Sequence, residues 1–348
     1  MDDNSLALTN VLHRYPLSGC EIAPLQKGHS NSQYRVRADQ GHFVLRRYAH
    51  PGDCGWNRKI RSRQSILYEH EVLRYAASHG IPCVPPIFDK TGDTVVEAND
   101  RFHAAFPYVE GETYRREYSI GLQAAALLGR FHRIMRDSPV RSQRPHRGMK
   151  CLIESWFNTC EYGLSEPEQL VGWARTLKPQ TDTQRYLAGS VDYVEEALRV
   201  LRHECPQCAV DASAVVVNHG DYYYANIGCR NDAIAVLYDF DDCSLDHPML
   251  DLSHLVWRFS GDAGRRVDPG RARELVQAYR RENDISINDL TTFPFFLIAN
   301  FLHIVLGLYG IVHLRPEPDL QWLTAVHMEI VKWHLVFREP MTTVLRGL

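Results

Sequence analysis

The chain has 348 residues, enough to bury a sizeable core in one bilobal unit or in two domains. Hydrophobic residues make up 45% and charged residues 23% of the sequence, the ordinary composition of a globular protein. The formal net charge of −3 gives no indication of a nucleic-acid partner, since such a partner favours a clustered basic surface. Arginines are dense in three segments that we interpret as solvated surface, at 58–63, 141–147 and 265–281.

Cysteine usage and the longest apolar run bear on where the protein works. Nine cysteines are scattered along the chain, an odd number that suits free thiols in a reducing compartment. The first residues lack the basic region and apolar core of a signal peptide. The apolar run 293–312 is interrupted by Pro294, Asn300 and His303, so we expect a buried helix and not a membrane span. The sequence therefore predicts a cytoplasmic protein with no membrane partner.

In chain order, the first hundred residues alternate between apolar and polar positions as a small sheet does. Because side chains alternate along a strand, Arg46 and Arg47 are expected on opposite faces. Four strands are predicted, with a hairpin between the first two, at 33–37, 42–48, 94–98 and 102–109.

The remainder of the chain is predicted to be mainly helical. The segment 65–77 is amphipathic, with Ile66, Val72 and Leu73 near one face. Further helices are predicted at 120–135, 186–202 and 271–282, and another begins at 247.

Two short segments in the second half of the chain carry the chemistry. The first is His219-Gly-Asp-Tyr-Tyr-Tyr-Ala-Asn226, and the second, Asp239-Phe-Asp241, begins thirteen residues after it. Strand-like runs at 215–217 and 233–238 lead into the two segments, so their acidic groups follow strand ends. An Asp and an Asn five residues apart, then a second Asp on a returning strand, is the spacing by which kinase folds place a base and two Mg²⁺ ligands around a γ-phosphate.

This spacing predicts a role for each of three side chains. Asp221 is predicted to be the base that orients and finally deprotonates an attacking hydroxyl group. Asn226 and Asp239 are predicted to hold Mg²⁺, because oxygen ligands suit a hard cation that keeps part of its water shell. No Ser stands in a Gly-x-Ser-x-Gly elbow, which leaves phosphoryl transfer as the chemistry that these residues fit.

The two segments resemble the Brenner-type motif of the aminoglycoside phosphotransferase and choline kinase superfamily: His-Gly-Asp, four residues, Asn, and then Ile-Asp-Phe. The resemblance implies an α+β, bilobal protein-kinase-like fold with a small antiparallel-sheet lobe and a mainly helical lobe. It implies transfer of phosphate from ATP or GTP, with Mg²⁺, to a hydroxyl group of a small molecule. One departure is that Tyr222-Tyr223-Tyr224-Ala225 stands where many relatives have Leu-His-Pro-Gly. The spacing is kept, and the aromatic side chains are expected to change the lip of the acceptor site.

The resemblance also implies the parts of a nucleotide site in the first lobe, residues 1–106. Arg46 stands where kinases usually place a Lys for the α- and β-phosphates, and Arg can bind phosphate oxygens bidentately. Whether Arg46 fully replaces that Lys is left open. The Glu that fixes this cation would be Glu69 by the family pattern, with Glu71 as the competing choice. The loop 27–32 resembles the nucleotide-covering loop, with the candidate residues Gly28, Ser30, Asn31 and Ser32.

A hinge and a second lobe complete the expected organisation. Residues 107–112 resemble the hinge, where backbone groups of Pro107 and Tyr108 would contact the base. The second lobe would span residues 113–348. Within it, His219 and Asp251 match residues that anchor the catalytic loop. Asp241 and Asp242 follow the motif and are candidates for a second metal, for a cationic acceptor, or for exposed turn acids.

The identity of the acceptor stays open among an antibiotic, homoserine, an amino alcohol and a sugar. Residues 140–200 are expected to decide it. A cationic acceptor would need an acidic pocket, for which the candidates are Glu154, Glu161, Glu166 and Glu168. Two alternatives are a protein Ser/Thr kinase of the bacterial stress-response type and a noncatalytic nucleotide-binding module. The oligomeric state is not indicated by the sequence.

Overall fold

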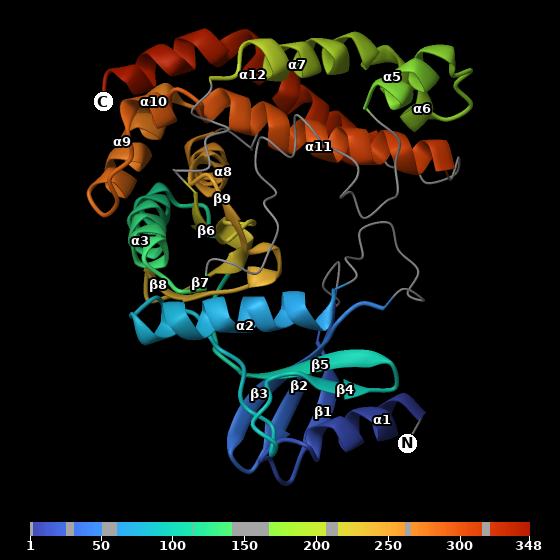
Figure 1. Cartoon of the computed structure of the whole chain (residues 1–348), viewed down its shortest axis with the longest axis vertical. Coiled ribbons are helices and arrows are strands. Elements are labelled where there is room, and N and C mark those ends of the chain that lie inside the picture. The colour runs from blue at the N-terminus through green and yellow to red at the C-terminus, as the bar shows by residue number, and fades with distance from the viewer. Residues whose placement is uncertain are drawn as a thin grey trace. The chain divides into compact units, whose positions relative to one another are not determined.

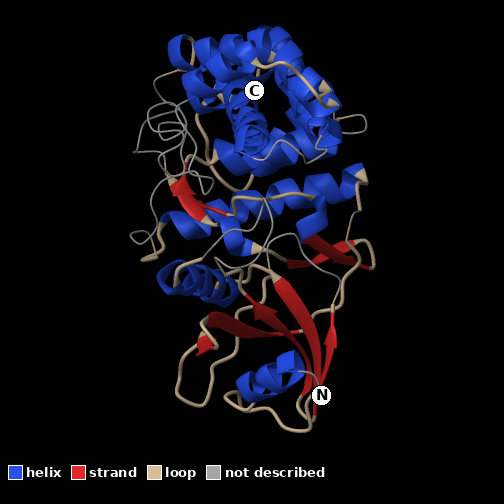
Figure 2. Ribbon diagram, turned by 90° about the vertical axis from the view of Figure 1, so that its right-hand side faces the viewer, coloured by secondary structure: helices blue, strands red, loops and turns tan. Residues whose placement is uncertain are grey.

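The computed structural model describes residues 3–25, 31–50, 61–113, 115–140, 167–206, 215–261, 266–314 and 321–348. The chain forms two compact units, whose helices and strands are shown in Figures 1 and 2. The first unit consists of Met1–Thr113, Ser138–Arg144 and Asn226–Asp241. The second consists of Tyr114–Asp137, Pro145–Ala225 and Asp242–Leu348. The segment that contains Asn226 and Asp239 therefore belongs to the same unit as the N-terminal sheet.

The first unit is built on a five-stranded antiparallel sheet, in which four strands lie at the ranges predicted from the sequence and β1 (Glu21–Pro24) is the additional strand. The predicted hairpin joins the second and third strands, with Ala38 opposite Gly41. In spatial order the strands are β1 (Glu21–Pro24), β2 (Ser32–Ala38), β3 (Gly41–Arg47), β5 (Arg101–Pro107) and β4 (Val96–Ala98).

Helices cover both faces of this sheet (Figure 1). On one face, α1 (Asp3–Leu12) contributes Leu8, Val11 and Leu12 to a buried cluster with the sheet residues Tyr34, Val36, Leu45, Val96 and Ala105. On the other face lies α2 (Arg63–Ser78), whose His70 contacts the Tyr48 hydroxyl at 3.1 Å. Since Leu45 faces the α1 side, its neighbour Arg46 faces α2.

Both ends of α2 are fixed by its own sequence. The Ser62 hydroxyl accepts a hydrogen bond from the Ser65 N–H and caps the first turn. At the other end Gly80 has φ of +78°, and the N–H of Ile81 donates to the Ala76 carbonyl at 3.0 Å. The buried stripe of the helix includes Ile66, Val72 and Leu73, the residues predicted to share one face.

Two short two-stranded sheets carry the sequence motif. In the second unit β6 (Val216–Asn218) pairs with β9 (Ser244–Asp246). In the first unit β7 (Ile227–Arg230) pairs with β8 (Ala233–Leu237). The strand-like runs that lead into the two motif segments thus form strands.

The described remainder of the second unit is mainly helical. Its core is made by α3 packing on α8 and α9, and by α11 packing on α12, α8 and α7. The helices are α3 (Tyr118–Arg136), α5 (Pro167–Thr176), α6 (Asp182–Gly189), α7 (Val191–His203), α8 (Met249–Ser260), α9 (Pro269–Arg280), α10 (Ile287–Leu290), α11 (Phe293–Leu314) and α12 (Gln321–Arg346).

One predicted helix is wrong in its continuity. The segment 186–202 was expected to be one helix, but α6 ends at Gly189 and α7 begins at Val191. Gly189 has low helix propensity. Ser190 ends α6, because its N–H donates to the Leu187 carbonyl at 3.0 Å and its hydroxyl to the Tyr186 carbonyl at 2.8 Å.

The apolar run 293–312 forms α11, as predicted. Its side chains Phe296, Ile298 and Leu302 are buried. Within the described ranges, no helix has the length and apolar character needed to cross a membrane.

His334 on α12 is a buried histidine whose burial makes the stability of the fold depend on pH. The His334 side chain is fully buried, and among the described residues neither ring nitrogen has a hydrogen-bond partner. Its ring contacts are aromatic, with Trp333 at 4.6 Å between ring centroids and Phe293 at 6.5 Å. Burial lowers the pKa of His334 to about 3, so the imidazole stays neutral in the folded protein.

We predict that His334→Leu makes the protein less sensitive to acid. The unfolded chain protonates this histidine below about pH 6.5, whereas the folded protein does not. The stability contributed by the neutral form is therefore present above about pH 6.5 and is lost as pH falls, by up to about 1.4 kcal/mol per pH unit. Between pH 7.5 and pH 5.0, denaturant unfolding should show wild type losing about 2 kcal/mol more than His334→Leu. Equal losses would contradict the prediction.

Candidate active site

The β7–β8 hairpin brings the Asn and the second Asp of the motif to one end. Asn226 directly precedes β7, and the first residue of that strand, Ile227, pairs with Leu237. The Tyr238 N–H donates to the Asn226 carbonyl at 2.8 Å, which extends the pairing by one residue. Asp239 follows immediately. The two predicted metal ligands are therefore held by the same pair of strands.

The backbone at Asp239 is in an unusual conformation. Its φ is +59°, in the left-handed region that costs a residue with a Cβ about 1–2 kcal/mol. The other described non-glycine residues with positive φ are Asn99, Asp100, Asn231 and Asp232, in turns between paired strands. Asp239 lies in no such turn. Strain of this kind persists where the surrounding structure fixes it and is frequent at functional sites.

A buried charge cluster surrounds Arg46 in the first unit. One terminal nitrogen of Arg46, Nη1, lies 2.9 Å from Glu69 Oε1 and 2.6 Å from Asp241 Oδ1. The Glu69 side chain is only 1% exposed, so this is a desolvated pair. The strand cation and the helix glutamate of the predicted nucleotide site are thus in direct contact.

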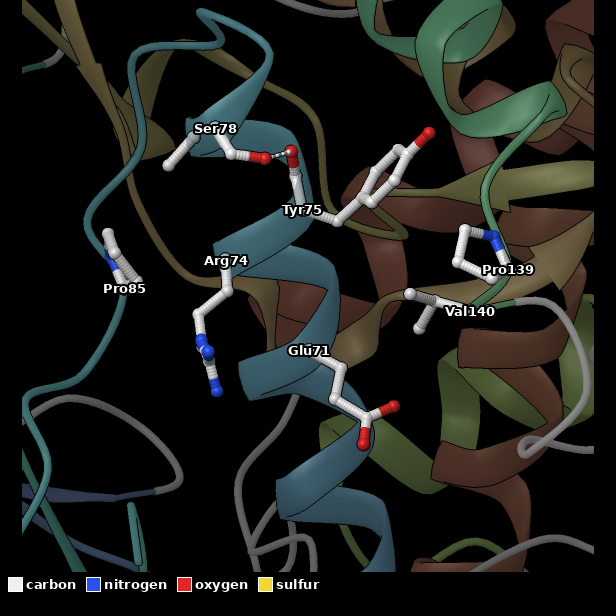
Figure 3. Close-up of a pocket in the computed structure, with 8 residues that line it drawn as sticks. Glu71, Arg74, Tyr75, Ser78, Pro85, Pro139 and Val140 are labelled. Atoms are coloured by element: carbon white, nitrogen blue, oxygen red, sulfur yellow. Dashed lines mark hydrogen bonds between the residues drawn. The ribbon is translucent and has the colours of Figure 1, made fainter. Parts of the chain in front are cut away.

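The competing glutamate of α2 faces elsewhere. Glu71 is exposed and lines a hollow of about 740 Å³ on the side of α2 shown in Figure 3. The hollow is bordered by Arg74, Tyr75, Ala77, Ser78, Pro85, Pro139 and Val140. None of the predicted site residues lines it, and the glutamate of α2 that contacts Arg46 is Glu69.

Arg61 joins the same cluster and corrects one expectation. The arginines at 58–63 were interpreted as solvated surface, but Arg61 is only 5% exposed. Its guanidinium donates to the Asp241 carbonyl oxygen and lies 3.4 Å from Glu69 Oε2. Arg63 does fit the surface interpretation, since it is exposed and pairs with Asp93. The sequence signal, a run of arginines, did not distinguish the two because their partners are distant in sequence.

Charges in the cluster balance, with two arginines against two carboxylates. Burial opposes the charged form of Arg46, but Asp241 and Glu69 outweigh it and raise the pKa of Arg46 well above its ordinary value. Burial and the charge of Asp241 raise the pKa of Glu69, while Arg46 and Arg61 lower it and favour the ionised carboxylate. The ionised form of Glu69 therefore depends on both arginines.

Asp241 is not an exposed turn acid. It is 8% exposed, and besides Arg46 and Arg61 it accepts a hydrogen bond from the Asn31 side chain. Asn31 in turn accepts from the Ala49 N–H at 3.3 Å. Asn31 is thereby fixed beside the charge cluster. Of the other predicted loop residues, Ser32 begins β2, while Gly28 and Ser30 lie outside the described residues.

The predicted hinge offers fewer backbone groups than its length suggests. Pro107 has no N–H, and the Tyr108 N–H donates to the His42 carbonyl at 2.9 Å. Only the backbone carbonyl oxygens of Pro107 and Tyr108 therefore remain to form hydrogen bonds with a nucleotide base. The Tyr108 ring is covered by the Arg35 guanidinium, 4.8 Å from the ring centroid.

In the second unit, Asp251 holds the backbone of the loop that precedes Asp221. Its two carboxylate oxygens accept from the His219 N–H at 2.6 Å and from the Gly220 N–H at 2.9 Å. The Asp221 N–H lies 3.3 Å from His219 Nδ1, which places the acceptor lone pair on that nitrogen. Asp221 is therefore positioned through three successive backbone N–H groups.

Asp251 is itself held by a residue that was not among the predicted site residues. His132, fully buried on α3, lies 3.2 Å from Asp251 Oδ2 and 2.8 Å from the Tyr279 hydroxyl. Burial lowers the pKa of His132, against the attraction of Asp251. The neutral ring links α3 and α9 to the loop, and only its position on the buried face of α3 could have indicated this.

The three tyrosines that replace the family pattern have separate environments. Tyr222 is buried, and its hydroxyl donates to the Ala124 carbonyl at 3.0 Å, so this side chain belongs to the core. Tyr223 stacks on His254 with 5.7 Å between ring centroids. Tyr224 packs against the guanidinium groups of Arg116 and Arg258. Those two arginines were not among the predicted site residues.

The donor set fits a divalent cation that retains water. Asn226 and Asp239 offer hard oxygen atoms, and both are fixed by the β7–β8 hairpin. Within the described part of the chain, no three His, Cys, Asp or Glu side chains gather as a closed metal cage. Mg²⁺ bound through one or two carboxylates and substrate phosphates does not require one.

The fold and site described above are those of a kinase-like phosphotransferase. They combine a five-stranded sheet, a helical unit, the charge cluster around Arg46 and the loop that Asp251 anchors. A profile of the Phosphotransferase enzyme family (APH) matches residues 21–284. The chain belongs to this family.

Known proteins similar to this chain agree with that class. Homoserine kinase of Rhodopseudomonas palustris is 21% identical over 291 residues, covering 82% of this chain and 78% of that protein. The structure of amicoumacin kinase hAmiN with AMP-PNP, Ca²⁺ and Ami has a TM-score of 0.63 at 19% identity, covering 98% of this chain and 94% of that one. Aminoglycoside phosphotransferase from Alicyclobacillus acidocaldarius gives a TM-score of 0.67 at 15% identity, covering 98% and 96%.

The protein is therefore a kinase that phosphorylates a hydroxyl group of a small molecule, with the predicted α+β kinase-like fold. As a kinase it takes phosphate from a nucleotide, with a divalent metal ion. The comparisons support neither alternative, the protein kinase or the noncatalytic module.

We predict that Arg61→Gln destabilises the protein much more than Arg63→Gln. Removing Arg61 leaves two buried carboxylates with one cation, which costs about 3 kcal/mol or more. The Arg63–Asp93 pair is exposed to solvent and is worth about 0–1 kcal/mol. Denaturant unfolding of the two variants measures the difference, and equal losses of stability would show that Arg61 carries no buried charge pair.

We also predict that Gly220→Ala abolishes function while Gly92→Ala does not. Both residues have similar positive φ, +87° and +84°. A Cβ at Gly220 would lie 2.2 Å from the Asp242 carbonyl oxygen, whereas one at Gly92 would meet nothing within 4 Å. Gly220→Ala must therefore displace the loop, and kcat/KM should fall at least about 100-fold. Similar kinetics for the two variants would mean that the close approach does not position Asp221.

Proposed function

We propose that the protein transfers the γ-phosphate of ATP or GTP, with Mg²⁺, to a hydroxyl group of a small molecule in the cytoplasm. The observation that carries the proposal is the anchoring of the Asp221 loop by both carboxylate oxygens of Asp251. A loop fixed through its backbone presents its carboxylate in one place, which is what alignment of an acceptor requires.

Asp221 has the role of orienting the acceptor. A carboxylate with a reference pKa of about 3.9 is a weak base at neutral pH. That is adequate here, because the transition state of phosphoryl transfer is loose and the proton leaves late. Asp221 accepts the hydrogen bond of the acceptor hydroxyl, holds its oxygen in line, and takes its proton as the new ester forms. His219 and Asp251 serve to position it.

Asn226 and Asp239 hold the metal ion. When bound, Mg²⁺ would neutralise negative charge on the phosphate oxygens as it develops. The backbone that carries the Asp239 carboxylate is fixed by its attachment to the hairpin. Asp241 is engaged with Arg46 and Arg61, so its contribution is to orient these cations. For Asp242 we retain two proposed roles, as a ligand of a second metal ion or as a contact of a cationic acceptor.

The nucleotide is bound by the first lobe. Arg46, held by Glu69, contacts the α- and β-phosphates, and the loop 27–32 covers them through backbone N–H groups. Carbonyl oxygens of Pro107 and Tyr108 accept hydrogen bonds from the base. We retain lobes at 1–106 and 113–348 with a hinge at 107–112 as the working division. A cytoplasmic location suits both the nucleotide supply and the free cysteines of the described chain.

The test is transfer of γ-labelled phosphate from ATP and GTP to a panel of aminoglycosides, amino alcohols, sugars and homoserine. We predict that Asp221→Asn lowers kcat at least about 1,000-fold while nucleotide affinity stays within about twofold. Asp239→Asn should instead raise the Mg²⁺ concentration needed for half-maximal rate at least about tenfold.

Asp232→Asn is the matched control, because this exposed Asp lies at the turn of the same hairpin. It should behave as wild type. Full activity of Asp221→Asn would remove this residue from the mechanism, and an unchanged Mg²⁺ requirement in Asp239→Asn would remove that ligand. Absence of nucleotide binding by wild type would overturn the proposed function as a whole.

A further inference from the structure

Two arginines flank Tyr224 in the second unit, two residues after the start of the Tyr222-Tyr223-Tyr224 run that departs from the family pattern. The guanidinium carbon of Arg116 lies 4.1 Å from the Tyr224 ring centroid, and its Nη2 donates to the Tyr224 hydroxyl. Arg258, on α8, has its guanidinium carbon 5.7 Å from the same ring centroid. Arg116, Tyr223, Tyr224, Trp257 and Arg258 are called the arginine–tyrosine cluster below.

The Arg258 guanidinium lies over aromatic rings. Its guanidinium carbon lies 3.9 Å from the Trp257 ring centroid and 4.9 Å from that of Tyr223. Its Nε donates to His254 Nε2 at 3.3 Å. Stacking occupies the faces of a guanidinium but leaves the edge with its terminal N–H groups to bind in the plane. That edge is the one that pairs bidentately with a carboxylate.

Neither arginine has a carboxylate partner among the described residues. This contrasts with Arg46 and Arg61, each of which contacts both Glu69 and Asp241. Arg258 is partly buried, and withdrawing a cation from water is costly unless an anion compensates it. The cluster therefore has an excess of positive charge.

The cluster lies within electrostatic reach of the catalytic loop. Burial lowers the pKa of Arg258, and Arg116 lowers it further, while Tyr224, Tyr223 and Asp221 act in the opposite direction. Asp221 and Tyr224 are also only three residues apart in the chain. An acceptor whose hydroxyl meets Asp221 can thus extend a second group toward these arginines.

We propose that the arginine–tyrosine cluster binds the carboxylate of the acceptor, which makes the substrate a hydroxy acid or a hydroxy amino acid. This inference rests on the proposed function and narrows its acceptor. The acidic pocket that a cationic acceptor would need finds no support in Glu168, which pairs with Arg202. The other three glutamates considered for it lie outside the described residues.

Matched acceptor pairs that differ in one group test the inference. The first pair is L-homoserine and 3-aminopropan-1-ol, which lacks the carboxylate. The second is 4-hydroxybutyrate and 4-hydroxybutyramide, which replaces it by an uncharged amide. For each pair the ratio of kcat/KM values is measured with ATP and Mg²⁺. A ratio does not change if a variant merely folds less well, because both values come from the same enzyme sample.

We predict that wild type prefers the carboxylate member of at least one pair by about tenfold or more. Arg258→Gln should lower that ratio about 10- to 100-fold, mainly through KM, and Arg116→Gln should lower it in the same direction. Arg258→Lys should retain part of the preference, since Lys keeps the charge without the bidentate geometry. Arg199→Gln, at an exposed arginine of α7, is the control and should leave the ratio unchanged.

Three results would overturn the inference while the kinase function stands. They are equal use of both members of each pair, an Arg258→Gln variant that slows all acceptors by one factor, and a preferred acceptor that has no acid group. Failure of the proposed function has a different signature, because wild type would then release no γ-phosphate from ATP or GTP to any acceptor or to water.

Discussion

The geometry of the site depends on one buried carboxylate, Asp251, which we assign a positioning role and not a catalytic one. Both carboxylate oxygens of Asp251 accept hydrogen bonds, from the backbone N–H groups of His219 and Gly220, and His132 orients the carboxylate. A carboxylate can be kept at this depth because it accepts hydrogen bonds from several donors, which offset its desolvation. Through it, α3, α8 and α9 fix the loop before Asp221, so the position of this residue, which we propose orients the acceptor, follows from the packing of the helical unit. Gly220 allows the loop to lie close to the backbone of Asp242, since a Cβ at this position would overlap the Asp242 carbonyl oxygen.

The two units handle charge in opposite ways. In the first, Arg46 and Arg61 are matched by Glu69 and Asp241, so four buried charges hold one another in place before any nucleotide binds. In the second, the contacts that Arg116 and Arg258 make with described residues are to aromatic rings and not to carboxylates. A matched cluster suits a preorganised phosphate site, while an unmatched one suits recognition of an anionic group on the acceptor. This difference connects the unusual tyrosines of the motif to substrate choice.

Sequence reasoning predicted the features that rest on local pattern. The sheet, the amphipathic helix α2, the buried helix α11 and the two strand-and-loop segments of the motif all follow from alternation, helical spacing and turn residues. It did not predict features that depend on partners distant in the chain. Arg61 meets an oxygen of a residue 180 positions away, so a run of arginines could not separate it from the exposed Arg63. The break at Gly189 was missed because the apolar spacing continues across it. Arg258 was missed because the tyrosines that it contacts, Tyr223 and Tyr224, belong to a different segment of the chain.

We propose that this chain forms a phosphate monoester on a small molecule that bears a carboxylate. The most direct measurement is ³¹P NMR of a reaction of the purified protein with ATP, Mg²⁺ and an equimolar mixture of L-homoserine and 3-aminopropan-1-ol. We expect a new phosphomonoester resonance on homoserine, with little on the amino alcohol and none when Asp221 is replaced by Asn. Preferential phosphorylation of 3-aminopropan-1-ol, or a product that persists without the Asp221 carboxylate, would contradict it.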